Sequence, residues 1–331
     1  MPKAHALLRA GLPYLTTLGM RRACSYPMDV ALGDDRVFFV VCRNEVEPNI
    51  RRLSWEDEDL GAIGAEVVWP LCIVRGDDGN FYVTDEGTHR VTALSAEGEI
   101  VRTWGEHGSG PGQLDHPSGL AFDAEGHLLV ADSGNHRIQR FTSEGRHLGG
   151  WGSHGNEPGQ FNMPWGLTVD DEGDVFIADW RNDRVQKLSA EGEPLLVIGA
   201  SGSGDGQFRR PAGVAVDEHG DIYVADRGND RVQLFAHDGH YVQKFLGEAT
   251  LSAIGRRYIL ANQKTLRLRE MANLEEQRLL RAPASVRVDG EGHLLVPDLG
   301  SHRVQIYKKE AYVLEPNEIM PPQSAPALLT T

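Results

Sequence analysis

The sequence predicts an all-β fold, a six-bladed β-propeller, and three observations lead to this class. Short apolar runs alternate with turn signals such as Ala-Glu-Gly and Ser-Gly-Asn over residues 117–152. Runs this short, separated by Gly-rich breaks, predict a four-stranded antiparallel meander instead of helices. The pattern recurs with prolines 47 residues apart, at Pro70, Pro117, Pro164 and Pro211. Repeated four-stranded sheets bury their faces on one another in a propeller.

The number of copies predicts the number of blades. An Asp follows each of these prolines by 15 residues, and an Arg follows by 20. A copy near the C-terminus keeps this spacing at Pro283, Asp298 and Arg303. A degenerate copy begins at Pro27, where Cys42 replaces the Asp. Together these are six copies, so we expect six blades.

The two ends of the chain are expected to close the ring. The last copy stops after its third strand, near Tyr307. The run LPYLTTLG at 12–19 is similar to the fourth strands of other copies, such as EIVRTWG at 99–105. We therefore expect residues 12–18 to supply the outer strand of the sixth blade. Closure removes the free sheet edges that an open ring would expose.

The repeats also resemble a known family. The runs GPGQLDHPSGLAFD, EPGQFNMPWGLTVD and DGQFRRPAGVAVD precede VADSGNHRIQRF, IADWRNDRVQKL and VADRGNDRVQLF, and all of them closely resemble NHL repeats. The resemblance covers about residues 20–307 and implies a six-bladed propeller. It implies no single function, because RNA binding, protein binding and an amidating lyase activity all occur on this fold.

Composition limits the classes of function. We expect a single domain over 1–310, with an insertion at 249–281 and an extended or disordered tail over 311–331. The net charge of −15 argues against RNA and anionic membranes as partners. Three cysteines without framework spacing favour reduced thiols in the cytoplasm. No stretch of the sequence reaches the ~20 apolar residues of a membrane span.

The insertion 249–281 interrupts the repeat and is locally basic. Its apolar residues recur at helical spacing, so we expect helices there. Because it replaces the long loop that enters the sixth blade, it is expected to cap the channel mouth or to dock a partner. The alternative is a helix packed on the side of the propeller.

The order of strands along the chain predicts which loops lie at the same end of the ring. The Asp-to-Arg loops and the long Gly-rich loops before each proline should share one end, which we expect to be functional. The repeated Asp and Arg are themselves expected to anchor loops, since function seldom needs identical copies. Positions that differ between copies are more informative. The predicted ligand- or partner-binding residues are Tyr26, Trp69, Glu86, His116, Trp165, Trp180, Arg210 and Arg227.

Two structural alternatives accompany this prediction. The rings of residues around the axis could simply plug the channel. The inner strands of the first and sixth blades carry Asp29 and Arg287. These side chains are expected to pair near the axis, as a core feature or as part of a site.

The predicted function is recognition of a protein, a peptide or a small organic ligand, without a cofactor. The alternative is a metal-independent lyase or hydrolase that uses His116, Asp29 or Arg210. Resemblance to the amidating lyase would imply metal-binding histidines directly after the blade prolines. The residues found there are Met28, Leu71, Ser118, Trp165, Ala212 and Ala284. We therefore expect no metal site, and we expect His89, His136 and His302, which share one repeat position, to lie apart around the rim.

Overall fold

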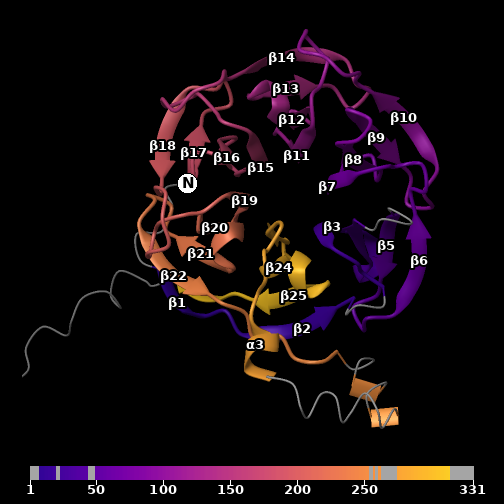
Figure 1. Cartoon of the computed structure of the whole chain (residues 1–331), viewed down its shortest axis with the longest axis vertical. Helices are drawn as coiled ribbons and strands as arrows, with labels where there is room; N and C mark the ends of the chain where they lie inside the picture. The colour runs from indigo at the N-terminus through magenta and orange to yellow at the C-terminus, as the bar shows by residue number, and fades with distance from the viewer. Residues whose placement is uncertain are drawn as a thin grey trace, which may run out of the picture.

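The computed structural model of the chain describes residues 7–19, 23–43, 49–252, 256–257, 260–261 and 274–313. These residues form six four-stranded sheets arranged radially around one axis (Figure 1), together with a small two-stranded sheet. All pairings between neighbouring strands of the six sheets are antiparallel, as a meander requires. The predicted six-bladed β-propeller is confirmed.

Each blade starts with the strand nearest the axis and ends at the rim (Figure 1). Blade one contains β3 (Pro27–Leu32), β4 (Phe38–Cys42), β5 (Asn49–Leu53) and β6 (Asp59–Ile63). Blade two contains β7 (Pro70–Arg75), β8 (Phe81–Asp85), β9 (Arg90–Leu94) and β10 (Ile100–Trp104). Blade three contains β11 (Pro117–Phe122), β12 (Leu128–Asp132), β13 (Arg137–Phe141) and β14 (His147–Trp151).

The second half of the ring follows the same plan. Blade four contains β15 (Pro164–Val169), β16 (Val175–Asp179), β17 (Arg184–Leu188) and β18 (Pro194–Ile198). Blade five contains β19 (Pro211–Val216), β20 (Ile222–Asp226), β21 (Arg231–Phe235) and β22 (Tyr241–Phe245). Blade six contains β23 (Arg287–Val288), β24 (His293–Asp298), β25 (Arg303–Lys308) and β2 (Tyr14–Leu18).

Burial explains the sequence pattern of the strands. The second strands, such as β12 and β20, are buried at every residue because neighbouring blades cover both of their faces. The outer strand β14 instead alternates between half-buried and exposed residues. The inner strands approach closely: a Cβ at Gly119 would lie 2.3 Å from the carbonyl oxygen of Trp165 in the next blade. The glycines of the inner strands are therefore required by packing between blades.

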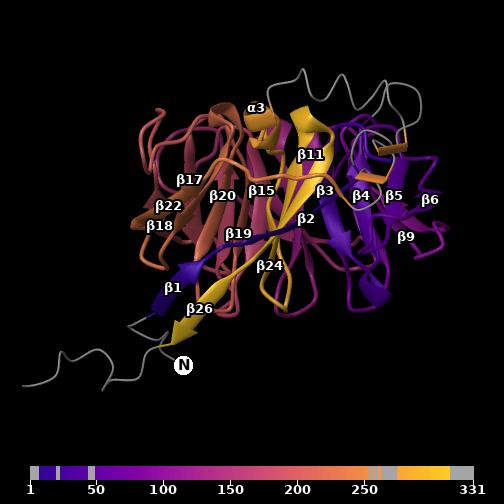
Figure 2. The ribbon, with the colours of Figure 1, turned by 90° about the horizontal axis from the view of Figure 1, so that it is seen from below.

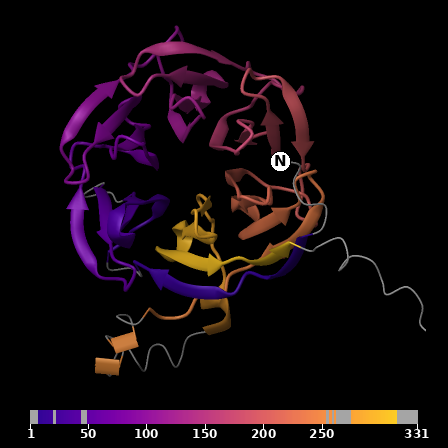
Figure 3. The same cartoon turned by 180° about the vertical axis from the view of Figure 1, so that it is seen from behind.

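The two ends of the chain close the ring, as predicted. Strand β2 pairs antiparallel with β25, and Leu18 lies opposite Val304. Figure 3 shows β2 in indigo along the outer edge of the yellow sixth blade. Before it, β1 (Leu7–Gly11) pairs with β26 (Glu310–Val313). Arg9 and Lys309 both bind Asp221 of blade five, at 2.5 and 2.9 Å. Residues 311–313, which we assigned to the tail, thus belong to a strand; 314–331 lie outside the described residues.

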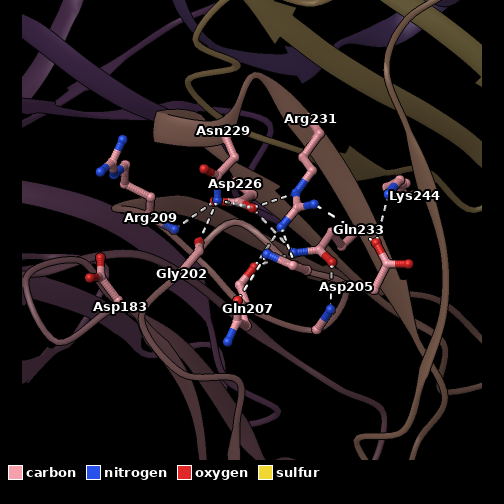
Figure 4. A network of polar contacts seen from close by, with 12 residues as sticks. Asp183, Gly202, Asp205, Gln207, Arg209, Asp226, Asn229, Arg231, Gln233 and Lys244 are labelled. Atoms are coloured by element: carbon pink, nitrogen blue, oxygen red, sulfur yellow. Dashed lines mark hydrogen bonds and ion pairs between the residues drawn. The ribbon is translucent and has the colours of Figure 1, made fainter.

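The repeated Asp and Arg anchor loops, as predicted. In blade five, Asp226 accepts hydrogen bonds from the Arg209 amide at 2.8 Å and from Arg231 Nε at 2.7 Å (Figure 4). Arg231 also donates to the carbonyl oxygens of Gly204 and Gln207, which lie in the long loop that leads into β19, the first strand of the same blade. The same ion pair forms in three more blades, as Asp132–Arg137, Asp179–Arg184 and Asp298–Arg303.

Blades two and six modify this anchor. In blade two, Arg90 is exposed, and Asp85 binds backbone amides, including that of Trp69 at 3.0 Å. In blade six, Arg303 donates to the carbonyl oxygens of Gln277 and Leu279. The short helix α3 (Leu274–Arg278) therefore takes the place of the long loop.

The described parts of the insertion lie outside the ring. Figure 1 shows α3 and the neighbouring orange segments beyond the outer strands of blades six and one. Figure 2 shows α3 at the end of the ring opposite β1 and β26. The predicted cap over the channel mouth is therefore not formed by the described residues, and 262–273 lie outside them. Among the described helices, none has the length and apolar character needed to cross a membrane.

Candidate functional site

The two ends of the ring differ. We call the end that carries the Asp-anchored loops the loop face, and the opposite end, which carries the turns 123–127, 170–174, 217–221 and 289–293, the short-turn face. On the loop face, the residue before the blade proline is in the left-handed region in every blade except blade two, for example Arg210 at φ 51°. In those five blades its amide donates to a His or Asp of the preceding blade, here Asp183 Oδ1 at 2.7 Å, whereas the Trp69 amide donates to Asp85 of its own blade. These links fix the side chains around the channel mouth.

Two of the predicted tryptophans form one group with arginines. The rings of Trp165 and Trp180 lie 5.3 Å apart. The Arg210 guanidinium lies 5.1 Å from the centre of the Trp180 ring, and that of Arg181 lies 5.7 Å from it. This geometry is that of a cation–π contact. Blades four and five therefore contribute one aromatic and cationic patch.

A second group lies on blades one and two. Trp69 is 49% exposed, and the Arg43 guanidinium lies 4.7 Å from its ring. Arg43 also forms an ion pair with Glu86. Arg43 was not among the predicted site residues, although its position after the repeated-Asp site of blade one matches that of Glu86 and Trp180 in their own blades.

Arg227 connects the two groups electrostatically. Burial lowers its pKa, and the positive charges of Arg43 and Arg210 lower it further. Within the described part of the chain, neither Arg210 nor Arg227 forms an ion pair, and Glu86 is the carboxylate paired with the group. We name Arg43, Trp69, Trp165, Trp180, Arg210 and Arg227 the Trp–Arg rim. The rim contains three arginines, and among the described residues one carboxylate, Glu86, pairs with them, so its net charge is positive.

The remaining predicted residues lie elsewhere on the loop face. Tyr26 is 46% exposed and packs edge-on against His302, with ring centres 4.3 Å apart. His116 lies beside His89 and Asp115 at the junction of blades two and three. No described contact joins Tyr26 or His116 to the Trp–Arg rim. As predicted, His89 and His302 occupy different blade junctions.

The channel itself is nearly filled. The residues directly after the blade prolines line its mouth, as expected: Met28, Leu71, Ser118, Trp165, Ala212 and Ala284. The cavity among them has a volume of about 20 Å³. A volume of this size holds about one water molecule. These residues therefore fill most of the channel along the axis, in agreement with the alternative that they plug it.

The buried pair expected near the axis is present. Arg287 donates to both carboxylate oxygens of Asp29, at 2.9 and 2.5 Å. Asp29 also accepts from Ser285 Oγ at 2.8 Å and from the Ile73 amide at 3.0 Å. Burial acts to raise the pKa of Asp29, but Arg287 and these hydrogen bonds hold it below its ordinary value. The pair thus joins the inner strands of blades six, one and two.

The short-turn face holds a larger cavity that the repeat pattern did not predict. Its volume is about 320 Å³, and its walls come from the turns of blades four, five and six. Acidic side chains, including Asp170, Asp217 and Asp289, line it together with Lys309. Lys309 is itself paired with Asp217 and Asp221. The cavity forms where turns of three neighbouring blades meet in the closed ring. The sequence of a single repeat does not show how these turns meet.

Known proteins share this architecture. A Staphylococcus aureus virginiamycin B lyase superposes with a TM-score of 0.56 at 11% identity, covering 90% of this chain and 99% of that one. A protein of unknown function from Bacteroides thetaiotaomicron gives 0.62 at 18% identity, covering 91% and 72%. At these identities the likeness shows the fold alone. The molecule is a six-bladed β-propeller.

The repeats identify the kind of propeller. The NHL repeat model matches residues 114–141, 161–188 and 208–235, which lie in blades three, four and five. The chain is 39% identical over 61 residues to the RING finger protein nhl-1 of Caenorhabditis elegans, a match that spans 18% of this chain and 6% of that protein. Blades three, four and five of this propeller therefore carry NHL repeats.

Proposed function

We propose that the chain is a recognition module that binds a peptide segment of a partner protein across the Trp–Arg rim of the loop face. The observation that carries the proposal is the pairing of the exposed Trp69 with Arg43 and of the half-buried Trp180 with the exposed Arg210. Tryptophan and arginine are the side chains that most often dominate binding energy at protein interfaces. NHL propellers are commonly protein-interaction modules, which agrees with this role.

The nearly filled channel favours a peptide over an enclosed small molecule. Pockets for small organic ligands have volumes of about 300–1,000 Å³ and bury most of the ligand. The cavity behind the rim, at about 20 Å³, admits no such ligand. A chain segment that lies over the mouth needs only the surface that the rim offers.

Charge favours an acidic segment. Arg43, Arg210 and Arg227 gather at the mouth, with Glu86 as their paired carboxylate. A guanidinium stacked on an indole ring keeps its N–H edge free to donate to a carboxylate. We therefore expect the ligand to present an Asp or Glu side chain, or a chain terminus, to these arginines.

The lyase or hydrolase alternative gains no support from the geometry of its candidate residues. Asp29 is buried and engaged by Arg287. His116 lies at the junction of blades two and three, and Arg210 stacks on Trp180. No contact among the described residues joins these three candidates, so they do not form an acid–base group.

A peptide selection tests the proposal. The full chain is immobilised and used to select binders from a random peptide library displayed on phage. The affinity of the best peptide is then measured by fluorescence polarisation. We expect enriched peptides to carry a carboxylate, and Trp180→Ala to weaken binding by about 30-fold, the effect of an interface hot spot.

Matched variants make the test specific. Glu218→Ala alters an exposed side chain on the short-turn face and should leave affinity unchanged. Arg210→Ala should weaken carboxylate peptides more than the same peptides with Gln or Asn. If Glu218→Ala weakens binding and the rim variants do not, the peptide site lies on the other face and the proposal is wrong.

A further inference from the structure

The junction of blades two and three gathers three histidines and one carboxylate on the loop face. His89 lies in the loop between β8 and β9, and His107 lies in the loop between β10 and β11. Asp115 and His116 immediately precede β11. The side chains of His107 and His116 are 68% and 50% exposed, whereas those of His89 and Asp115 are mostly covered. Solvent therefore reaches the group from one side.

All three imidazoles point a nitrogen at the same carboxylate oxygen. Asp115 Oδ1 lies 3.4 Å from His89 Nδ1, 3.4 Å from His107 Nε2 and 2.6 Å from His116 Nδ1. The ligand atoms of His89, His107 and Asp115 lie within 4.8 Å of one another. Around a tetrahedral Zn²⁺ with bonds of about 2.0–2.1 Å, neighbouring ligand atoms are about 3.3 Å apart. The two 3.4 Å separations match that edge.

The carboxylate is held in place by its surroundings. The Asp115 amide donates to Asp132 Oδ1 at 2.6 Å, and the Asp115 carbonyl accepts from the Gly134 amide at 2.8 Å. A Cβ at Gly134 would lie 2.4 Å from Asp115 Oδ2. Since Arg181 occupies the matching position in blade four, the backbone there accepts a side chain. Glycine also occupies the matching positions 87, 228 and 300, and at 134 it leaves the space that the Asp115 carboxylate fills.

The next junction supplies an internal comparison. Between blades three and four, the Met163 amide donates to His136 Nδ1 at 3.1 Å, just as the His116 amide donates to His89 Nδ1 at 3.1 Å. His154 packs on His136 with ring centres 4.4 Å apart, as His107 does on His89 at 4.3 Å. The junction thus forms without a carboxylate, because Asn162 and Met163 replace Asp115 and His116. Asp115 and His116 are therefore not needed to form the junction itself.

We propose that His89, His107 and Asp115 bind a divalent transition-metal ion, best matched by Zn²⁺, and that His116 orients Asp115. Two imidazoles and one carboxylate form a common ligand set for zinc. His116 Nδ1–H donates to Asp115 Oδ1, in the manner of the outer partners that fix metal ligands.

Metal binding must replace one hydrogen bond. His89 Nδ1 has a single lone pair, which the His116 amide now uses. Coordination by Nδ1 releases that amide, which is exposed and can donate to water instead. With three protein ligands and the exposed side chain of His107 among them, the site would leave a fourth position for water or a ligand group, as open zinc sites do. This inference does not depend on the peptide proposed above.

Titration of the purified full chain with Zn²⁺ alone, followed by calorimetry, tests the site. We expect one ion per chain with a Kd in the micromolar range or tighter, and Co²⁺ should give the visible absorption of a tetrahedral site. His107→Ala removes an exposed side chain and should weaken binding at least tenfold. Gly134→Ala, which displaces Asp115, should also weaken it. Circular dichroism checks that both variants fold.

Two control variants make the result decisive. His154→Ala changes the matching residue of the next junction and should leave Zn²⁺ affinity unchanged. His127→Ala removes the histidine of another group, with Asp123 and Glu125, whose geometry could hold a metal ion. Absence of binding by the wild-type chain, or equal binding by His107→Ala, would overturn the proposal. Loss of Zn²⁺ binding in His127→Ala but not in His107→Ala would overturn it as well.

Discussion

Replacing Leu18 with alanine probes closure of the ring. Leu18 lies on β2 and is fully buried, in a cluster that includes Phe38 and Leu53 of blade one and Leu295 of blade six. Truncating a buried leucine to alanine costs about 2–5 kcal/mol, because transfer free energy is lost and a cavity remains. For 331 residues, an unfolding entropy of about 2.1 cal/mol/K per residue converts this to a Tm lowered by about 3–7 °C.

Differential scanning calorimetry measures this shift, and the same strand supplies the control. Leu15 is 43% exposed, so Leu15→Ala should change the free energy of unfolding by less than about 0.5 kcal/mol. A Leu18→Ala variant that melts at the wild-type temperature, or equal shifts in the two variants, would refute the assignment of β2 to the interface of blades six and one.

Two further changes test the anchors of the fold. Arg231→Ala should destabilise the protein by about 3–5 kcal/mol in chemical unfolding, because it leaves the buried Asp226 carboxylate without its cation, whereas the exposed Arg90→Ala should have almost no effect. Equal effects would contradict the anchor role. Because the pKa of Asp29 is held below its ordinary value, its pair with Arg287 contributes stability above about pH 4 that is lost as pH falls through the folded pKa. The stability difference between wild type and Asp29→Asn should therefore shrink on acidification; a constant difference from pH 7 to the acid transition would show that the pair makes no such contribution.

The sequence predicted the ring because its repeat is regular. The 47-residue spacing specifies four of the blades, and the unmatched strands at both chain ends specify how the last blade closes. The pairing of Asp29 with Arg287 also followed, since the departure of each from its repeat position placed both near the axis in neighbouring blades.

Contacts between blades were harder to predict than the blades themselves. The stacking of Arg43 on Trp69 depends on how far loops from different blades reach over the mouth. The grouping of His107 with Asp115 depends on a long loop folding back on itself, since His107 forms a bridge with Leu114. Neither follows from repeat positions alone. The described parts of the insertion lie outside the ring, and Arg303 holds its final described turn through the carbonyl oxygen of Gln277.

Hydrogen–deuterium exchange of the chain with and without a selected peptide tests the binding face most directly. Our account predicts slower exchange at the loops around Trp69, Trp180 and Arg210, which surround the channel mouth. The acidic cavity on the opposite end is the competing location. Protection confined to the turns 170–174, 217–221 and 289–293 would contradict the assignment of the loop face as the recognition surface.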